Sequence, residues 1–104
     1  LSYRGVMMKT VFFVEKDDFS KAKHITNQEP IVRQSITFRD NKSLGMEKEG
    51  NYLLIDGTDD ACKEAEEKLE GVAEKLEGEE SDKVIKKMEE LENSALEGFG
   101  GIFG

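Results

Sequence analysis

The chain of 104 residues contains no tryptophan, one cysteine and one proline. No apolar run approaches the roughly 20 residues that cross a bilayer, so we expect no membrane segment. The single cysteine, Cys62, excludes an internal disulfide and fits a reducing, cytoplasmic setting. The start of the chain also lacks the long apolar stretch and small-residue cleavage site of a signal peptide. These absences together predict a cytoplasmic protein.

Basic residues are scarce in the second half of the chain. Residues 1–48 contain nine Lys and Arg against six Asp and Glu, a net charge of +3. Residues 49–104 contain six against seventeen, a net charge of −11. A protein that binds duplex nucleic acid needs a basic face to displace counterions, so we expect no nucleic-acid partner. The high content of Glu and Lys is typical of a thermophilic source.

The length predicts a single domain over residues 1–104. Its first residues, LSYRGVM, precede MKTVFFV, which reads like the start of a natural protein. We therefore interpret residues 1–7 as a non-native leader and Met8 as the physiological start. The alternative is a genuine N-terminus that frays, as termini commonly do.

The first half of the chain has the patterns of β-strands. TVFFVE, residues 10–15, is apolar on both faces and predicts a buried strand. IVRQSITFRD, residues 31–40, alternates apolar and polar side chains and predicts a half-exposed strand. LGME predicts the start of another strand, and NYLLIDG, residues 51–57, a further one. Between the first two, DDFSKAKHITNQ predicts a short helix capped by Asp17.

From Thr58 the apolar spacing becomes helical. Thr58 suits an N-cap, and an apolar stripe runs from Cys62 to Leu76. Gly78 is expected to end this helix, and Ser81 to cap a second one that packs antiparallel to the first. The alternative is one long helix kinked at Gly78. Either way we predict an α+β fold, with a small antiparallel sheet of N-terminal strands covered on one face by a C-terminal helix pair or one long broken helix.

The sequence offers little for catalysis. His24, the only histidine, has no evident nucleophile or metal-ligand spacing around it, which favours a surface histidine. Cys62 lies on the apolar stripe and is expected to be a small core residue. No Gly-x-Ser-x-Gly motif or glycine-rich phosphate loop occurs. We therefore predict that the protein is not an enzyme and needs no cofactor.

One acidic segment partly fits the calcium loop of an EF-hand. DGTDDACKEAEE, residues 56–67, supplies oxygen atoms at several of the required positions, but Ala61 stands where the loop needs glycine. A weak divalent-cation or small-ligand site through Asp56, Asp59 and Asp60 stays as the alternative function. The favoured interpretation is that these aspartates stabilise the start of the helix that follows.

The chain closes on EGFGGIFG, an unusual ending for so polar a sequence. The glycines from Gly98 onward are expected to end the helix. Burying Phe99, Ile102 and Phe103 gains about 1.5–3 kcal/mol each, which ordering the segment nearly cancels. We therefore predict that residues 98–104 form an apolar tail that docks on a neighbouring copy or on a protein partner. The alternative is a fold-back onto the chain's own sheet. The predicted function is a non-enzymatic structural or protein-interaction module, an assembling subunit.

The segments NYLLIDGTDDACKEAEEKLEG and EGFGGIFG resemble a small uncharacterised protein family of hyperthermophilic archaea. The resemblance covers most of the chain from Met8 onward. It implies a compact α+β protein without assigned activity. The shape of such proteins is similar to the peripheral wedge domain of tailed-phage-type capsid proteins, which implies a structural or assembly role.

Overall fold

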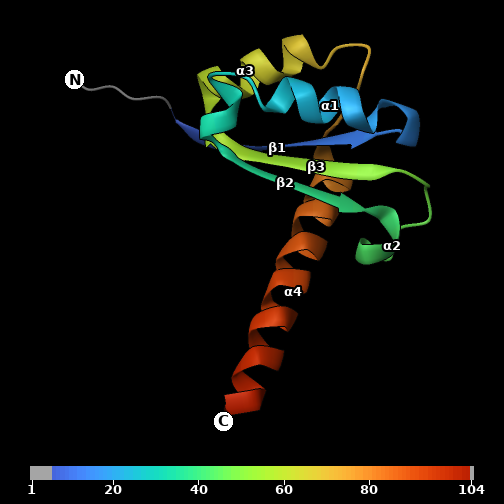
Figure 1. Cartoon of the computed structure of the whole chain (residues 1–104), viewed down its shortest axis with the longest axis vertical. Coiled ribbons are helices and arrows are strands. Elements are labelled where there is room, and N and C mark those ends of the chain that lie inside the picture. The colour runs from blue at the N-terminus through green and yellow to red at the C-terminus, as the bar shows by residue number, and fades with distance from the viewer. Residues whose placement is uncertain (1–5, 104) are drawn as a thin grey trace.

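The structure is a computed structural model that describes the backbone of residues 6–103 and the side chains of residues 6–94. It is an α+β fold with an antiparallel sheet, as the sequence predicts (Figure 1). The helices and strands in chain order are β1 Met7–Val14, the 3₁₀ helix η1 Lys16–Asp18, α1 Phe19–Thr26, the 3₁₀ helix η2 Ile31–Arg33, β2 Ser35–Asp40, α2 Asn41–Leu44, β3 Asn51–Thr58, α3 Asp59–Lys68, β4 Glu74–Leu76 and α4 Gly78–Phe103.

The four strands form one open sheet in the order β2-β3-β1-β4, and every neighbouring pair is antiparallel. β1 and β3 pair along their whole length, from Met7 opposite Thr58 to Val14 opposite Asn51. β1 and β3 form the centre of the described sheet, so the two outer strands are its edges. The short β4 is one edge, and β2 is the other.

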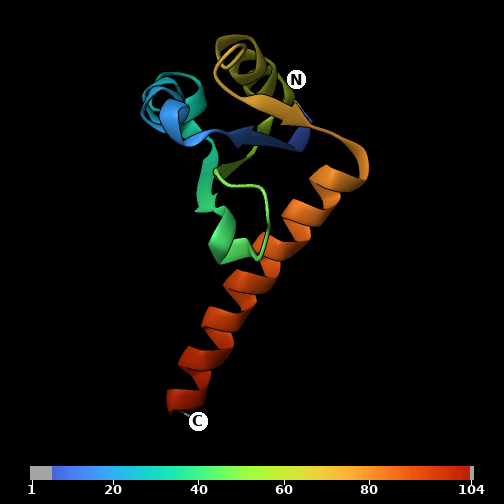
Figure 2. The ribbon, with the colours of Figure 1, turned by 90° about the vertical axis from the view of Figure 1, so that its right-hand side faces the viewer.

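Helices cover both faces of this sheet (Figures 1 and 2). The alternation of β1 sends Phe12 and Val14 into a cluster beneath α1 and α3. Val11 and Phe13 point the other way, into a cluster with residues of α2 and α4. The break between the two C-terminal helices is therefore present, but the helices lie on opposite faces instead of packing as a pair. Two apolar layers enclose the sheet, because its central strand is apolar on both sides.

Several local features differ from the sequence predictions. The strand predicted over residues 31–40 begins only at Ser35, after a 3₁₀ helix, and the N-cap position of α1 is Asp18 instead of Asp17.

The helix predicted from Thr58 ends at Lys68, because the chain turns at Gly71 with φ +82° and Glu74–Leu76 then joins the sheet as β4. The predicted strand at LGME is absent, and that segment belongs to α2 and the loop after it. α2 begins where the Asp40 carboxylate accepts a hydrogen bond from the Ser43 amide, at 2.9 Å.

α4 begins at Gly78, three residues before the expected cap at Ser81. Val84 and Met88 are buried against the sheet, and Leu91 packs at the margin of the same cluster. Figures 1 and 2 show that the helix then runs away from the sheet. Its backbone stays helical to Phe103, so the expectation that the glycines end it differs from the structure. None of the described helices is long and apolar enough to cross a membrane.

The described chain starts close to the first turn of α3. The Val6 carbonyl accepts a hydrogen bond from the Asp59 amide at 2.8 Å, and Met7 pairs with Thr58. Residues 1–5 lie outside the described part of the chain. Whether residues 1–7 are a leader stays a prediction.

Candidate functional site

The free edge of β2 carries backbone groups that no described strand satisfies. Asn41 donates its amide to the Gly50 carbonyl at 2.9 Å, in the register that pairs Asp40 with Asn51. In an antiparallel ladder, alternate residues exchange both hydrogen bonds with the partner strand. Residues 35, 37 and 39 therefore bond to β3. Ile36 and Phe38 direct their N–H and C=O groups to the open edge.

One hydrogen bond confirms this alternation. The Arg39 guanidinium donates from Nη1 to the Phe38 carbonyl at 3.2 Å. That carbonyl must point away from β3 to be reached by a neighbouring exposed side chain. Arg39 thus lies along the edge and covers one of its acceptors, as charged residues often do at exposed edge strands.

An open groove of about 540 Å³ lies between this strand and α1. Its apolar part consists of Val32, Ile36 and Phe38, all of which remain partly exposed. The polar part comes mainly from α1 and contains no Asp or Glu. Its residues are Ser20, Lys23, His24, Thr26 and Asn27.

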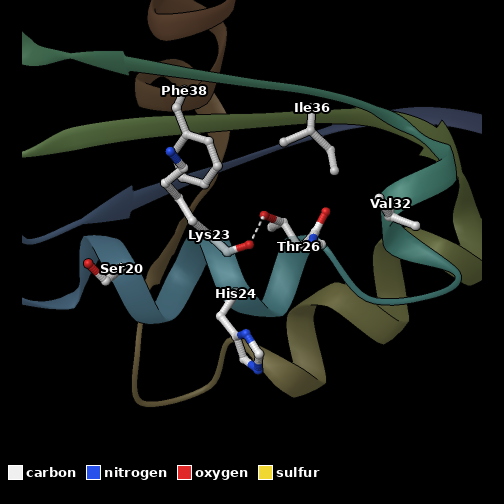
Figure 3. Close-up of a pocket in the computed structure, with 8 residues that line it drawn as sticks. Ser20, Lys23, His24, Thr26, Val32, Ile36 and Phe38 are labelled. Atoms are coloured by element: carbon white, nitrogen blue, oxygen red, sulfur yellow. Dashed lines mark hydrogen bonds between the residues drawn. The ribbon is translucent and has the colours of Figure 1, made fainter.

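Aromatic packing positions the groove. Phe19 on α1 contacts Phe38 edge to face, with ring centroids 5.3 Å apart, and so holds α1 over β2. The Lys23 ammonium lies 5.3 Å from the centroid of the Phe19 ring. Figure 3 shows Lys23 extending toward Phe38, and Ile36 and Phe38 pointing from the strand toward α1. The groove therefore has an apolar floor beside a cationic side chain.

His24 lines the groove but takes no part in the contacts among Phe19, Phe38 and Lys23. Its side chain is exposed, and Figure 3 shows it pointing away from the other labelled side chains. The prediction of a surface histidine is confirmed. Among the described residues no group is placed to orient it as a general base.

Cys62 is fully buried between α3 and the sheet. Its Sγ lies 3.8 Å from the Met8 carbonyl oxygen and 4.0 Å from that of Ile55. The prediction that it is a small core residue is confirmed.

The three candidate metal ligands lie on different parts of the fold. Asp56 lies on β3 and lines a cavity of about 260 Å³ beside α4, whereas Asp59 and Asp60 start α3 on the other face. The Thr58 hydroxyl accepts from the Ala61 amide at 3.3 Å, so the predicted N-cap is confirmed. Within residues 6–94, no group of three or more His, Cys, Asp or Glu side chains is arranged to hold a metal ion. Cation binding through these residues stays a prediction.

The predicted partner-binding residues Phe99, Ile102 and Phe103 lie beyond the described side chains. Only the helical backbone that carries them is described. Docking through the tail therefore stays a prediction. The edge of β2 was missed by sequence reasoning, although the alternation of residues 31–40 was visible. Nothing in that pattern shows which side of a strand remains unpaired.

No family of known proteins, no curated protein and no solved structure matches the chain.

Proposed function

We propose that the chain is a non-enzymatic protein-interaction module that receives an extended segment of another polypeptide at the free edge of β2. The observation that carries the proposal is the register of β2, which directs the backbone groups of Ile36 and Phe38 outward. An extended segment added to a sheet edge gains affinity from main-chain hydrogen bonds and specificity from pockets for alternate side chains.

The groove supplies such pockets. In an antiparallel pair, directly opposed residues share a face of the sheet. Incoming residues opposite Ile36 and Phe38 therefore point toward α1, where Val32 is 38 % exposed. Apolar side chains placed there bury surface that the isolated chain leaves in water. The binding energy at this site comes from backbone hydrogen bonds to Ile36 and Phe38 and from this burial of apolar surface.

The structural or assembly role implied by the resemblance to capsid wedge domains is the broader form of this proposal. Three further statements about the chain stay predictions: that it belongs to the archaeal family, that its source is thermophilic and that its location is cytoplasmic. Docking of the segment 98–104 onto a neighbouring copy or a partner belongs here as well. Deleting that segment tests it, since loss of oligomeric mass or of a partner without a lower melting temperature is the expected result.

The test of edge binding uses the full ¹⁵N-labelled chain and a six-residue peptide, matched in length to β2, in which Val alternates with Gln. Peptide addition is expected to shift and protect the amides of Ile36 and Phe38. Methylating the backbone nitrogens of alternate peptide residues blocks one edge of the peptide strand. One methylation pattern is expected to abolish binding, and the other to leave it intact.

Two variants of the chain provide the matched comparison. Ile36→Pro removes an outward N–H that β3 does not use, and proline is tolerated at such edge positions. Ile36→Val keeps that N–H. The proline variant is expected to bind the peptide about tenfold more weakly, the cost of roughly one hydrogen bond. If both methylation patterns weaken peptide binding equally, or if the amide shifts lie far from β2, the proposal is contradicted. Neither outcome depends on the two variants.

A further inference from the structure

The geometry points to a basic partner: an extended segment with apolar residues facing α1 and a Lys or Arg beside Ser35. This inference rests on the proposed function, because it names the chemistry of the segment that the free edge of β2 receives. Ser35 is the first residue of β2. In an antiparallel pair the C-terminal end of the segment therefore lies there, so the inference also fixes the direction of the segment.

The two faces of β2 select different side chains. On the α1 face, Ile36 and Phe38 form the apolar floor of the groove, and Lys23 extends over it toward Phe38 (Figure 3). On the other face, Ser35 and Arg39 line the cavity beside α4. A shift of the segment by one residue turns its basic side chain from the α4 face toward Lys23. Repulsion by that ammonium group therefore disfavours the shifted register.

The α4 face holds carboxylates that the described cations do not fully pair. Its cavity of about 260 Å³ is lined by Asp56, Glu89 and Glu92. Glu89 accepts from Lys9 at 3.2 Å. Asp56 and Glu92 form no ion pair within the described side chains. A cation that reaches this cavity from the open edge therefore meets free acceptors.

The sheet register brings the edge within reach of Asp56. Asp56 lies directly opposite Ser35 in the ladder between β3 and β2. Neighbouring strands are about 4.8 Å apart, so the α-carbon of a residue added beside Ser35 lies roughly 10 Å from that of Asp56. Ser35 is small and exposed and leaves the path open. The long side chain of Lys or Arg can therefore lie across Ser35 toward the Asp56 carboxylate.

Arg39 restricts the cation to one end of the segment. It lies on the same face as Ser35 but four residues along β2, roughly 13 Å away. Its guanidinium donates to the Phe38 carbonyl and forms no ion pair with a described carboxylate. Like charges directly opposite each other destabilise a strand pair. A basic residue is therefore accepted beside Ser35 and disfavoured beside Arg39.

Long-range charge favours a basic segment over a second copy. The chain carries a net charge of −8, which attracts a basic segment and repels another copy of the chain. The β2 strand of a second copy can offer its own Arg39 beside Ser35. It also brings its own α1, and with it a second Lys23, to the shared edge. The occupant that fits both observations is a basic segment of another polypeptide.

The experiment compares three six-residue peptides with acetylated and amidated ends. The parent is Val-Gln-Val-Gln-Val-Gln, and its two isomeric derivatives are Val-Gln-Val-Gln-Val-Lys and Val-Lys-Val-Gln-Val-Gln. Because the isomers have the same charge, the long-range attraction is equal for both. The antiparallel register that places two Val opposite Ile36 and Phe38 puts Lys beside Ser35 in the first isomer and beside Arg39 in the second.

Affinities for the full chain are measured by fluorescence anisotropy of labelled peptides, and the amide shifts of Ile36 and Phe38 locate the binding. The isomer with Lys at its C-terminal end is expected to bind about fivefold more tightly than the other isomer. At about 0.5 M NaCl, where screening is strong, most of that difference is expected to disappear.

Asp56→Asn is the informative variant, because it keeps the shape of the side chain and removes its charge. It is expected to weaken binding of the C-terminal Lys peptide about threefold and to leave the affinity for the parent peptide unchanged. Glu90→Gln removes the same charge from an exposed residue of α4 that does not line the cavity. This control is expected to bind all three peptides as the native chain does.

The outcomes separate the two proposals. Equal binding of the two isomers at the edge of β2, or tighter binding of the isomer with Lys in the second position, overturns the basic partner and leaves the edge site standing. Absence of binding by all three peptides overturns the proposed function and, with it, this inference. Concentration-dependent protection of the Ile36 and Phe38 amides without any peptide identifies a second copy as the occupant and also overturns the inference.

Discussion

Gly50 shows how closely single residues are fitted in this fold. Its φ is +152°, and a Cβ added there would overlap the Phe13 ring and lie 2.9 Å from the Val14 carbonyl oxygen. Neither neighbour yields easily, since Phe13 is buried and the other atom is backbone. Gly71 also has positive φ, +82°, but a Cβ there would meet nothing within 4 Å.

We predict that Gly50→Ala lowers the free energy of unfolding by about 2–4 kcal/mol, the sum of backbone strain and overpacking. Gly71→Ala is expected to cost only about 1 kcal/mol, the backbone part alone. Urea unfolding of both variants measures the difference. Equal losses would show that the close contact at Gly50 is relieved at no cost.

Asp40 links pH to the stability of α2. Hydrogen bonds from the side chain and amide of Ser43, with a smaller effect from Lys42, lower the pKa of Asp40 below its usual 3.8. A lowered folded-state pKa means that the carboxylate stabilises the fold above the unfolded pKa. That stability is lost as the pH falls through the folded pKa.

We therefore predict that Asp40→Ala destabilises the protein at neutral pH and that the gap from the native chain narrows below about pH 3.8. Unfolding curves at several pH values measure the gap. Asp40→Asn is the control, because it keeps a capping oxygen without the charge, and its gap to Asp40→Ala should not change with pH. A gap between native chain and Asp40→Ala that is constant down to pH 2.5 contradicts the assignment.

At the scale of elements, α4 is held by a few apolar side chains near its start. Met88 is 6 % exposed and packs with Val11 and Tyr52 in the cluster on that face. We predict that Met88→Ala lowers the free energy of unfolding by about 2–4 kcal/mol. Lys86→Ala, an exposed change in the same helix, should stay within about 0.5 kcal/mol. A loss for Met88→Ala no larger than that for Lys86→Ala would contradict the role of Met88 packing in holding α4, since alanine lowers helix propensity at neither position.

The long strands were predictable because their patterns are strong. TVFFVE and NYLLIDG are apolar on both faces, and they form the central strands β1 and β3. The same observation should have predicted helices on both faces of the sheet. A strand with apolar side chains on both of its faces needs cover on each side. We predicted helices on one face only, which left the second apolar side of β1 and β3 without cover.

The short elements were not predictable, because tertiary contacts decide them. Leu69, Val72 and Leu76 fit a helical stripe, yet the helix ends before them, and Leu76 lies in β4 opposite Val11 of β1. Gly71 was the available signal for that turn. The candidate site has the same origin, since the groove exists only where Phe19 of α1 meets Phe38 of β2. Sequence spacing does not bring those two residues together.

At the scale of the whole molecule, charge works against the fold. The net charge is −8, and the described ion pairs all lie at the surface, with side chains at least 32 % exposed. Exposed pairs contribute little, so repulsion among the acids of the second half dominates. We predict that the melting temperature rises from very low to moderate NaCl concentration, because salt screens that repulsion. Calorimetry at matched pH measures it, and a constant melting temperature would contradict the prediction.

The projecting helix has a hydrodynamic consequence. The radius of gyration is 14.7 Å, against about 13 Å for a compact domain of this size. α4, with 26 residues, is about 39 Å long. Such a molecule tumbles anisotropically, and amide vectors along the helix axis relax differently from those in the sheet. It also elutes from a sizing column ahead of a sphere of 11.7 kDa, so early elution of a single copy follows from its shape.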